Sequence, residues 1–530
     1  MKGTHKVNLA ALAMGLAAAL VVRAEPRTVG DDLQVLWDDD VVDTRATTAT
    51  RVLHHPEYAG PALVHDAPWE GDGSDFHNIL TDRDEKGVLY RLYYLGWSMH
   101  LVPKERDGFS NKGIRVCYAE SRDGIHWVKP DLGLVEFNGS KANNILFDET
   151  ENKWDNFMVF KDANPSCPPE MRYKAVARTE GFKDRERIHP AGPELGFYHS
   201  ADGVHFKRGG WVLLRGLGFD TLNVGFWDAV RGEYHLYVRA FHRNEKERNG
   251  DVVVRDIRHA VSKDFKVWSE PKRLDFTDAA TGAPAEDMPL YTNMIEPYPR
   301  APKLFVGFPS RYVERRAWTK NYDRLPDVQA RRWRMDPKHG GSGRYGLVVT
   351  DCAFIMSRDG QAFQRDEEAF LRPAPEHAGN WVYGECYPVR GLIETPGRVG
   401  DDREFSMFLP EYGWSGKAKR FNRYALRLDG FVSRQAPYAG AKVVTKPLVF
   451  TGSELLVNFA TSARGRLFVT VRGDKGAKLR SVELFGNKVD RPVDFESGRL
   501  ADFAGKPVTV EFEMYDADLY SFRFRGGQAE

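Results

Sequence analysis

The chain consists mainly of short segments in which apolar and polar residues alternate, separated by Gly, Asn and Asp. Examples rich in β-branched and aromatic residues are VLYRLYYLGW (88–97), EYHLYVRAF (233–241) and KLFVGF (303–308). Amphipathic helical periods are scarce. Because a period of two is that of a half-buried strand, the pattern predicts an all-β protein built from hairpins.

A seven-residue motif, Ser-x-Asp-Gly-x-x-aromatic, recurs four times among these segments. It reads SRDGIHW (121–127), SADGVHF (200–206), SKDFKVW (262–268) and SRDGQAF (357–363). The Asp-Gly pair supplies a turn in which Gly is free to adopt a positive φ. The Ser can hydrogen-bond the turn backbone, and the aromatic residue can pack against the returning strand.

A second marker stands upstream of three motif copies, where an acidic residue opens an apolar strand 42 to 46 positions earlier. These acids are Asp75, Asp155 and Asp220. A longer fourth unit begins near Tyr291, and a fifth runs from Glu385 to RLDGF (427–431). Five meandering units of this length predict a five-bladed β-propeller, because each blade is one such strand meander.

The domain organisation follows from where this pattern starts and stops. Residues 1–24 combine a basic start, an apolar run and a small residue before Glu25, which predicts a signal peptide. Residues 25–435 are assigned to the propeller, and LQVLWDDDVVD (33–43) is expected to close the ring or pack on its flank. From residue 436 clear alternation without the acidic marker predicts an accessory β-sandwich, 436–530.

The inner strands of a propeller start at one mouth of its central channel, so acids at those starts should converge. We therefore predict Asp75, Asp155, Asp220 and Glu385 as catalytic carboxyl groups, against the alternative that they are ordinary strand-start residues. Nearby residues that could contact substrate complete the predicted site. They are His77, Asn78, Trp97, Asn223, Glu286, Asp287, Tyr291, Asp351 and Trp381.

Composition and charge limit the classes of ligand and partner that the protein is expected to bind. The net charge of +1 offers no broad basic face for nucleic acid, and 12 Trp, 21 Tyr and 32 Phe suit both β-sheets and surfaces that stack on sugars. No cysteine pair or histidine cluster has zinc-ligand spacing, so we expect no metal and no cofactor. With the signal peptide and no second apolar run of membrane-spanning length, the mature protein is expected to be periplasmic or secreted from a bacterium, with no stable membrane span.

Three stretches resemble the five-bladed propeller glycoside hydrolases. They are SRDGIHWVKPDLGLVEFNGSKANNILFD (121–148), DTLNVGFWDAVRGEYHLYVR (220–239) and LRLDGFVS (426–433). The resemblance is greatest to exported bacterial proteins similar to the N-terminal domain of glycoside hydrolase family 32, with families 43 and 62 as relatives. It covers roughly residues 30 to 435 and allows a structural cation in the channel.

The resemblance implies a role for each acid. Asp75 stands where that superfamily has its nucleophile or base in Asp-Pro-Asn, and Asp155 where it has the transition-state stabiliser in Arg-Asp-Pro. Asp220 stands where it has the acid in Glu-Cys-Pro, but is Asp rather than Glu, so Glu385 or the Glu286-Asp287 pair could donate the proton instead.

The chemistry that two carboxyl groups can perform agrees with this, since one can protonate a glycosidic oxygen while the other attacks or activates water. We predict an exported, exo-acting glycoside hydrolase acting on an oligo- or polysaccharide. A non-catalytic carbohydrate-binding propeller and a glycoside phosphorylase remain alternatives. The insertion at 311–345 is rich in Lys and Arg and is interpreted either as a solvated loop or as a lid for an anionic sugar.

Overall fold

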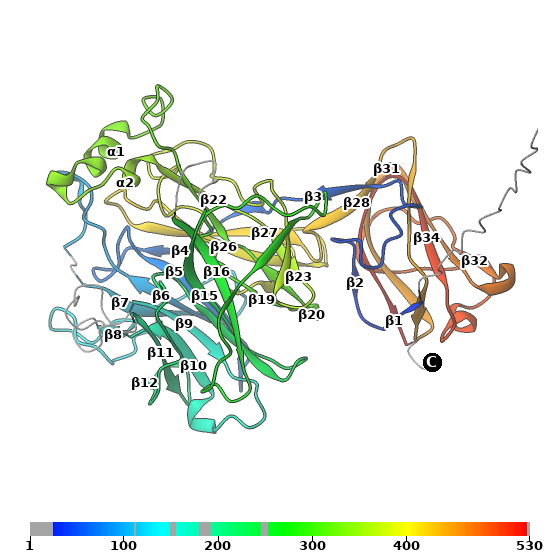
Figure 1. Ribbon diagram of the computed structural model, residues 1–530, viewed down its shortest axis with the longest axis horizontal. Helices are drawn as coiled ribbons and strands as arrows, with labels where there is room; N and C mark the ends of the chain where they lie inside the picture. Colours follow the sequence, from blue (N-terminus) through cyan, green and yellow to red (C-terminus); the bar gives the residue numbers. More distant parts are fainter. Residues whose placement is uncertain (1–24, 111–112, 149–154, 180–191, 245–252, 527–530) are drawn as a thin grey trace, which may run out of the picture.

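The computed structural model describes residues 25–110, 113–148, 155–179, 192–244 and 253–526. Five antiparallel sheets follow one another around a ring, and a further sheet lies to one side (Figure 1). The predicted all-β, five-bladed propeller is therefore confirmed. The predicted signal peptide lies outside the described residues.

Each blade is a meander whose first strand is innermost. Blade 1 contains β5 (Asp75–Asp84), β6 (Gly87–Gly96), β7 (Arg115–Ser121) and β8 (Ile145–Asp148). Blade 2 contains β9 (Asp155–Lys161), β10 (Tyr173–Arg178), β11 (Glu194–Ser200), β12 (Lys207–Arg208) and β13 (Leu214–Arg215). Blade 3 contains β14 (Val224–Asp228), β15 (Glu233–Arg243), β16 (Val253–Ser262) and β17 (Lys272–Arg273). Short 3-10 turns lie at Lys104–Arg106 and Pro169–Met171.

Blades 4 and 5 depart from a simple meander. Blade 4 contains β19 (Glu296–Tyr298), β20 (Ala301–Gly307), β23 (Ile355–Ser357) and β24 (Ala362–Arg365), with β18 (Asp275–Asp278) added in parallel to β24. Blade 5 contains β25 (Ile393–Pro396), β26 (Arg403–Glu411) and β27 (Lys419–Arg427) and takes its outer strand, β4 (Glu57–His65), from the start of the chain. Thus the segment 57–65 closes the ring, which leaves for 33–43 the other predicted alternative, packing on the flank of the propeller.

The insertion of blade 4 forms a small capping unit. A hairpin of β21 (Ser310–Glu314) and β22 (Val348–Cys352) carries α1 (Val328–Met335), the 3-10 turn Pro337–His339 and α2 (Arg344–Leu347). Figure 1 shows α1 and α2 at the end of the propeller farthest from the C-terminal sheet.

The C-terminal strands form a curved eight-stranded sheet around their own core. Six of the eight strands are β28 (Val432–Ala436), β29 (Ala441–Val444), β31 (Glu454–Arg472), β32 (Lys478–Arg480), β33 (Asn487–Pro492) and β34 (Thr509–Arg525), and the other two come from the start of the chain. β30 (Leu448–Phe450) belongs to a separate two-stranded sheet, and 3-10 turns lie at Asp474–Gly476 and Leu500–Phe503. The long strands β31 and β34 pair with each other, and each has different outer neighbours in its two halves. This change of neighbours lets one sheet curve around a core that a two-sheet sandwich would enclose.

The first strands of the chain pair with this C-terminal unit. β1 (Arg27–Gly30) pairs with β30, β2 (Gln34–Val35) with β34 and β3 (Thr50–Leu53) with β28. The segment 33–43 therefore lies at the junction of the two units, where Trp37 packs edge-on against Tyr298 and Phe354 of the propeller. The domain limits 25–435 and 436–530 stay predictions, and these pairings add that residues 27–53 accompany the C-terminal strands.

The repeated motif folds as its sequence predicts and also joins neighbouring blades. In the second copy, the backbone N–H of Gly203 donates to Ser200 Oγ at 2.9 Å, and Gly203 has φ +81°. The hydroxyl of Tyr93, from blade 1, donates to the carbonyl of Gly203 at 2.9 Å. Tyr237 makes the same contact from blade 3 to Gly360 at 2.8 Å. The third copy places Phe265 rather than Gly at positive φ, +63°, where its ring is buried.

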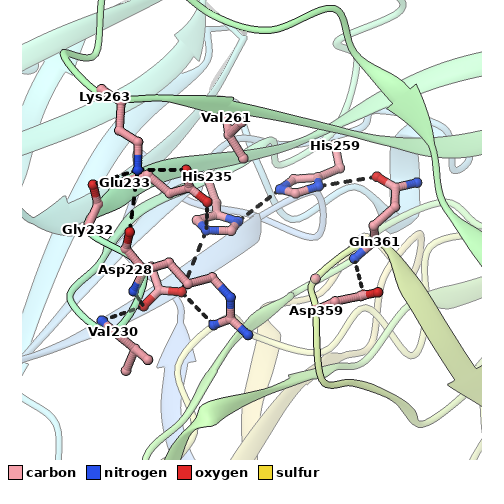
Figure 2. A network of polar contacts seen from close by, with 12 residues as sticks. Asp228, Val230, Gly232, Glu233, His235, His259, Val261, Lys263, Asp359 and Gln361 are labelled. Carbon is pink, nitrogen blue, oxygen red and sulfur yellow. Dashed lines mark hydrogen bonds and ion pairs between the residues drawn. The ribbon is translucent and has the colours of Figure 1, made fainter.

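A buried histidine pair forms a further joint between blades 3 and 4 (Figure 2). His235 Nδ1 lies 2.9 Å from His259 Nε2, and His259 Nδ1 lies 3.3 Å from the side-chain oxygen of Gln361, in the turn of the fourth motif copy. Burial lowers the pKa of His235 to about 3 and that of His259 to about 4. Both rings are therefore neutral in the folded protein near pH 7.

Replacing Gly360 with Ala should destabilise the protein more than the same change at Gly232. Both glycines have positive φ, which costs Ala about 1–2 kcal/mol. A Cβ at Gly360 would also lie 2.8 Å from Tyr237 Oη, whereas nothing lies within 4 Å at Gly232. We expect Gly360→Ala to lower the free energy of unfolding, measured with urea, by ~1–3 kcal/mol more than Gly232→Ala does. Equal losses would contradict the blade joint.

The stability of the protein should fall as the pH drops from about 6.5 towards 4. A histidine with a lowered folded-state pKa binds its proton mainly in the unfolded chain, so protonation favours unfolding by up to ~1.4 kcal/mol per pH unit for each ring. His65 and His77 add to the slope, because burial lowers their pKa values too. We expect His259→Gln to flatten the pH dependence measured by urea unfolding. His126→Gln, at an exposed histidine, should leave it unchanged.

Candidate active site

A cavity of about 360 Å³ lies where blades 1, 3 and 5 meet the insertion. Its wall contains two predicted acids, Asp75 and Asp220, and the predicted aromatic residues Trp97 and Tyr291. The structure thus brings together four predicted residues from separate parts of the sequence. Functional candidates that sequence reasoning missed also line it: Asp72, Arg344, Tyr383, Tyr387, Trp414 and Lys419.

Asp75, the first residue of β5, is held in the floor of this cavity. Its Oδ2 accepts from Lys419 Nζ at 2.8 Å, and its Oδ1 accepts from the backbone N–H of Phe76 at 3.0 Å. The carboxyl is only 7% exposed. Burial raises the pKa of Asp75, although the Lys419 ammonium offsets part of that effect.

Asp220 is the more open of the two carboxylates. It lies four residues before β14, not at the first residue of an inner strand, and its side chain is 31% exposed. Arg239 Nη1 donates to Asp220 Oδ1 at 2.7 Å, and Arg239 Nη2 donates to the carbonyl of Tyr291. This fully buried arginine fixes an ionised carboxylate at the cavity wall.

His77, predicted to bind substrate, lies behind Asp75 rather than in the cavity wall. Its Nδ1 lies 4.0 Å from Asp75 Oδ1, and its Nε2 lies 2.9 Å from His65 Nε2. His65 Nδ1 in turn lies 3.5 Å from Glu70 Oε1. Glu70 also accepts from Tyr94 Oη and from Lys129 Nζ. A buried polar chain therefore runs from Asp75 to Lys129.

Glu70 determines which ring nitrogens donate and which accept along this chain. Burial alone would raise its pKa, but His65 and Lys129 together lower the pKa of Glu70 to about 2, so it is an obligatory acceptor. His65 must then carry its proton at Nδ1 and accept at Nε2 from His77 Nε2–H. The Nδ1 of His77 has no hydrogen-bond partner among the described residues and is left with a lone pair beside Asp75. This lone pair disfavours the ionised form of Asp75.

The other two predicted acids occupy different positions. Asp155 is the first residue of β9 by its backbone, and its side chain lies outside the described residues. Glu385 precedes β25 by eight residues, in an irregular segment, and accepts the backbone N–H of Trp381. Burial, followed by the charge of Glu411, raises the pKa of Glu385 to about 8. Its neighbours Gly384 and Tyr387 line the cavity, but Glu385 does not.

The two predicted asparagines hydrogen-bond to backbone groups and do not line the cavity. Asn78 donates to the carbonyl of Val159 at 3.0 Å and accepts its N–H at 3.2 Å, which joins blade 1 to blade 2. Asn223 donates to the carbonyl of Phe219 and accepts the backbone N–H of Arg239. Both are buried among protein partners, and the structure does not bring them to the cavity.

The remaining predicted residues also lie elsewhere. Glu286 and Asp287 line a second cavity of about 360 Å³, where Asp287 accepts from His242 Nε2 at 2.7 Å. Asp351 pairs with Arg311 in the β21–β22 hairpin, and Trp381 Nε1 donates to the carbonyl of Ala374. A larger cavity of about 570 Å³ lies between blade 5 and the C-terminal sheet and contains none of the predicted residues.

The aromatic wall suits a hydroxylated ring. Tyr291 and Tyr387 stack with centroids 5.0 Å apart, and Tyr383 Oη donates to Tyr291 Oη at 3.0 Å. Trp97 Nε1 and Tyr387 Oη are buried without a partner among the described residues. Both residues line the cavity, so these two groups are available as hydrogen-bond partners for the hydroxyls of a ligand.

The described residues contain no group of three or more His, Cys, Asp or Glu placed to hold a metal ion. A structural cation in the channel stays a prediction. Within the same residues, no helix is both long and apolar enough to cross a membrane.

Comparison with known proteins identifies no family model and no curated protein that matches the chain. Three solved structures illustrate the loose likeness that does exist. An N-acetylgalactosamine deacetylase from F. plautii, with blood group B trisaccharide, is 14% identical over 72% of this chain and 96% of its own, with a TM-score of 0.42. An exo-β-1,3-galactanase from Phanerochaete chrysosporium is 11% identical over 87% and 99%, with a TM-score of 0.35.

The third, a family 43 arabinoxylan arabinofuranohydrolase from Bacillus subtilis, is 10% identical over 87% of this chain and 80% of its own, with a TM-score of 0.30. Identities and TM-scores this low carry no inference about the reaction of this chain. Its chemistry must be argued from its own residues.

Histidine tautomers provide a direct check of the buried chain. Long-range ¹H–¹⁵N correlation spectra of protein labelled at histidine should show His65 protonated at Nδ1 and His77 at Nε2, assigned with His65→Asn and His77→Asn variants. Glu70→Gln should remove the fixed tautomer at His65, because a carboxamide can donate as well as accept. Asp75→Asn should change neither tautomer. Protonation of His77 at Nδ1 in the unaltered protein would contradict the scheme.

Proposed function

We propose that this protein is an exported, exo-acting glycoside hydrolase whose active site is the cavity of Asp75 and Asp220. The observation that carries the proposal is the placement of these two carboxyl groups in one aromatic-walled cavity. Glycoside cleavage needs two carboxyl groups that differ in protonation, and the two environments differ. A cavity of about 360 Å³ is more consistent with binding a chain end than with threading a polysaccharide.

The surroundings of the two acids favour distinct roles. Burial and the lone pair of His77 favour the protonated carboxyl at Asp75 and outweigh the opposing effect of the Lys419 ammonium, so we assign Asp75 as the proton donor. Asp220, ion-paired with Arg239, is assigned as the carboxylate that attacks the anomeric carbon or activates water. This assignment is opposite to the one implied by the family resemblance. The role of Asp155 stays a prediction, and Glu385 is assigned no direct contact with substrate.

A carbohydrate-binding propeller without catalysis is the second candidate. The ion pairs Asp75–Lys419 and Asp220–Arg239 favour it, because each carboxylate already has a cationic partner. A phosphorylase would need several donors converging on a phosphate, and the cavity offers a single unpaired cation among the described residues.

Turnover of a glycan panel should separate these functions. We expect the mature protein to release sugar from at least one aryl glycoside or polysaccharide. Asp75→Asn and Asp220→Asn should each lower kcat by ~10²–10⁴-fold, the usual contribution of an acid or base. Glu286→Gln, in the other cavity, should keep full activity. Sugar binding without turnover would favour the binding propeller instead.

The leaving group of the substrate tests the two roles. Dinitrophenolate needs no protonation to leave, so a variant lacking the acid should recover activity on dinitrophenyl glycosides. We expect this recovery for Asp75→Asn and not for Asp220→Asn. The reverse pattern would exchange the two roles while retaining the pair.

A further inference from the structure

Arg344 is the cationic residue in the cavity wall that lacks an acidic partner among the described residues. The other ionisable groups in the cavity wall have partners. Lys419 pairs with Asp75, and Asp220 pairs with Arg239. Asp72 is held by backbone N–H groups of Met99 and Gly416 at 2.9 and 3.0 Å. A guanidinium whose N–H donors have no acidic partner favours an anionic group of a ligand beside it.

Arg344 is presented to the cavity by aromatic rings. It opens α2 of the insertion, with its guanidinium carbon 5.0 Å from the ring centroid of Tyr345 and 5.2 Å from that of Tyr383. Its one hydrogen bond, from Nη2 to Tyr383 Oη, is long at 3.5 Å. These cation–π contacts hold the guanidinium near the two rings but leave most of its N–H donors for another partner.

The other arginines near it in the insertion are already used by the protein. Arg331 donates to the carbonyls of Gly346 and Trp381, and Arg334 donates to the carbonyl of Trp414. Arg332 pairs with Asp323 on the surface. Arg331 and Arg334 therefore fasten the insertion to the propeller, and Arg344 differs from these arginines in facing the cavity.

We propose that Arg344 binds the carboxylate of an acidic sugar, so that the substrate of this cavity carries a uronate unit. This inference rests on the proposed function of the cavity and names its substrate class. A planar guanidinium matches a planar carboxylate through two parallel N–H···O bonds. The sugar ring would lie against the tyrosines, and its hydroxyls would meet Trp97 Nε1 and Tyr387 Oη.

Inorganic phosphate is the competing anion, and the site suits it less. A phosphate site typically combines several cations or a cluster of backbone N–H groups. Here one arginine lies beside two aromatic rings, and Lys419, the other cationic residue of the cavity wall, donates to Asp75.

Equilibrium binding tests the proposal without requiring turnover. Calorimetric titration would use the methyl glycosides of glucuronate and galacturonate, their neutral uronamides, the parent neutral hexosides and inorganic phosphate. We expect at least one uronate to bind about tenfold or more tightly than its uronamide, with an affinity that falls as salt rises. Binding of the uronamide as tightly as the uronate, no sugar binding at all, or preferential binding of phosphate would each overturn the proposal.

Variants at two arginines localise the effect. Arg344→Gln should abolish the preference for uronate over uronamide, and Arg344→Lys should keep part of it. Arg332→Gln, at the paired surface arginine of the same insertion, should leave the preference intact. A preference that survives in folded Arg344→Gln protein, judged by its thermal melt, would refute the role of Arg344. If that variant does not fold, the salt and uronamide comparisons on the unaltered protein still decide.

These experiments distinguish failure of the acidic-sugar site from failure of the hydrolase proposal. Uronate binding that depends on Arg344, without hydrolysis of any uronide, would retain the acidic-sugar site and reject the hydrolase. Hydrolysis of a neutral glycoside that is indifferent to Arg344→Gln would retain the hydrolase and reject the acidic-sugar site.

Discussion

Closure of the propeller ring is the constraint on which the rest of the molecule depends. The outer strand of blade 5 is β4, from the start of the chain, and it pairs with β27 from near residue 420. In that pairing the last residue of β4, His65, lies opposite the first residue of β27, Lys419. Both then reach blade 1, since Lys419 contacts Asp75 and His65 contacts His77. The contact that closes the ring is thus also the support of the candidate active site.

This coupling explains why the cavity can hold charge in a buried place. Asp75 and Lys419 stand 344 positions apart in sequence, and each would be costly to bury without the other. The histidine chain behind them ends on Glu70 and Lys129, which carry the remaining buried charge towards the surface. A site supported in this way is rigid, because every polar group but a few is already satisfied by protein. Trp97 Nε1 and Tyr387 Oη belong to residues of the cavity wall and, like His77 Nδ1, have no hydrogen-bond partner among the described residues.

The insertion shows how a basic segment can have two uses at once. Buried Arg331 and Arg334 donate to backbone carbonyls of the loops below, and burial lowers the pKa of Arg334 to about 10. A salt bridge between Arg106 and Asp327 fastens the other side of the insertion. Fixed at both sides, the insertion can place Arg344 and Tyr345 in the wall of the cavity. Composition alone could not separate the structural arginines from the one left for a ligand.

The sequence by itself determined the architecture. Alternation, the four copies of the Ser-x-Asp motif and the spacing of the acids specify five strand meanders, because these are local properties of turns and pleated strands. They also led to Asp75, Asp220, Trp97 and Tyr291. Only the tertiary structure decided which candidates share a cavity. Asn78 and Asn223 resemble ligand-binding residues in sequence, yet their partners are backbone groups. Lys419 and Arg344 carry no local signal, because their importance comes from charges that ring closure and the insertion bring to them from distant parts of the chain.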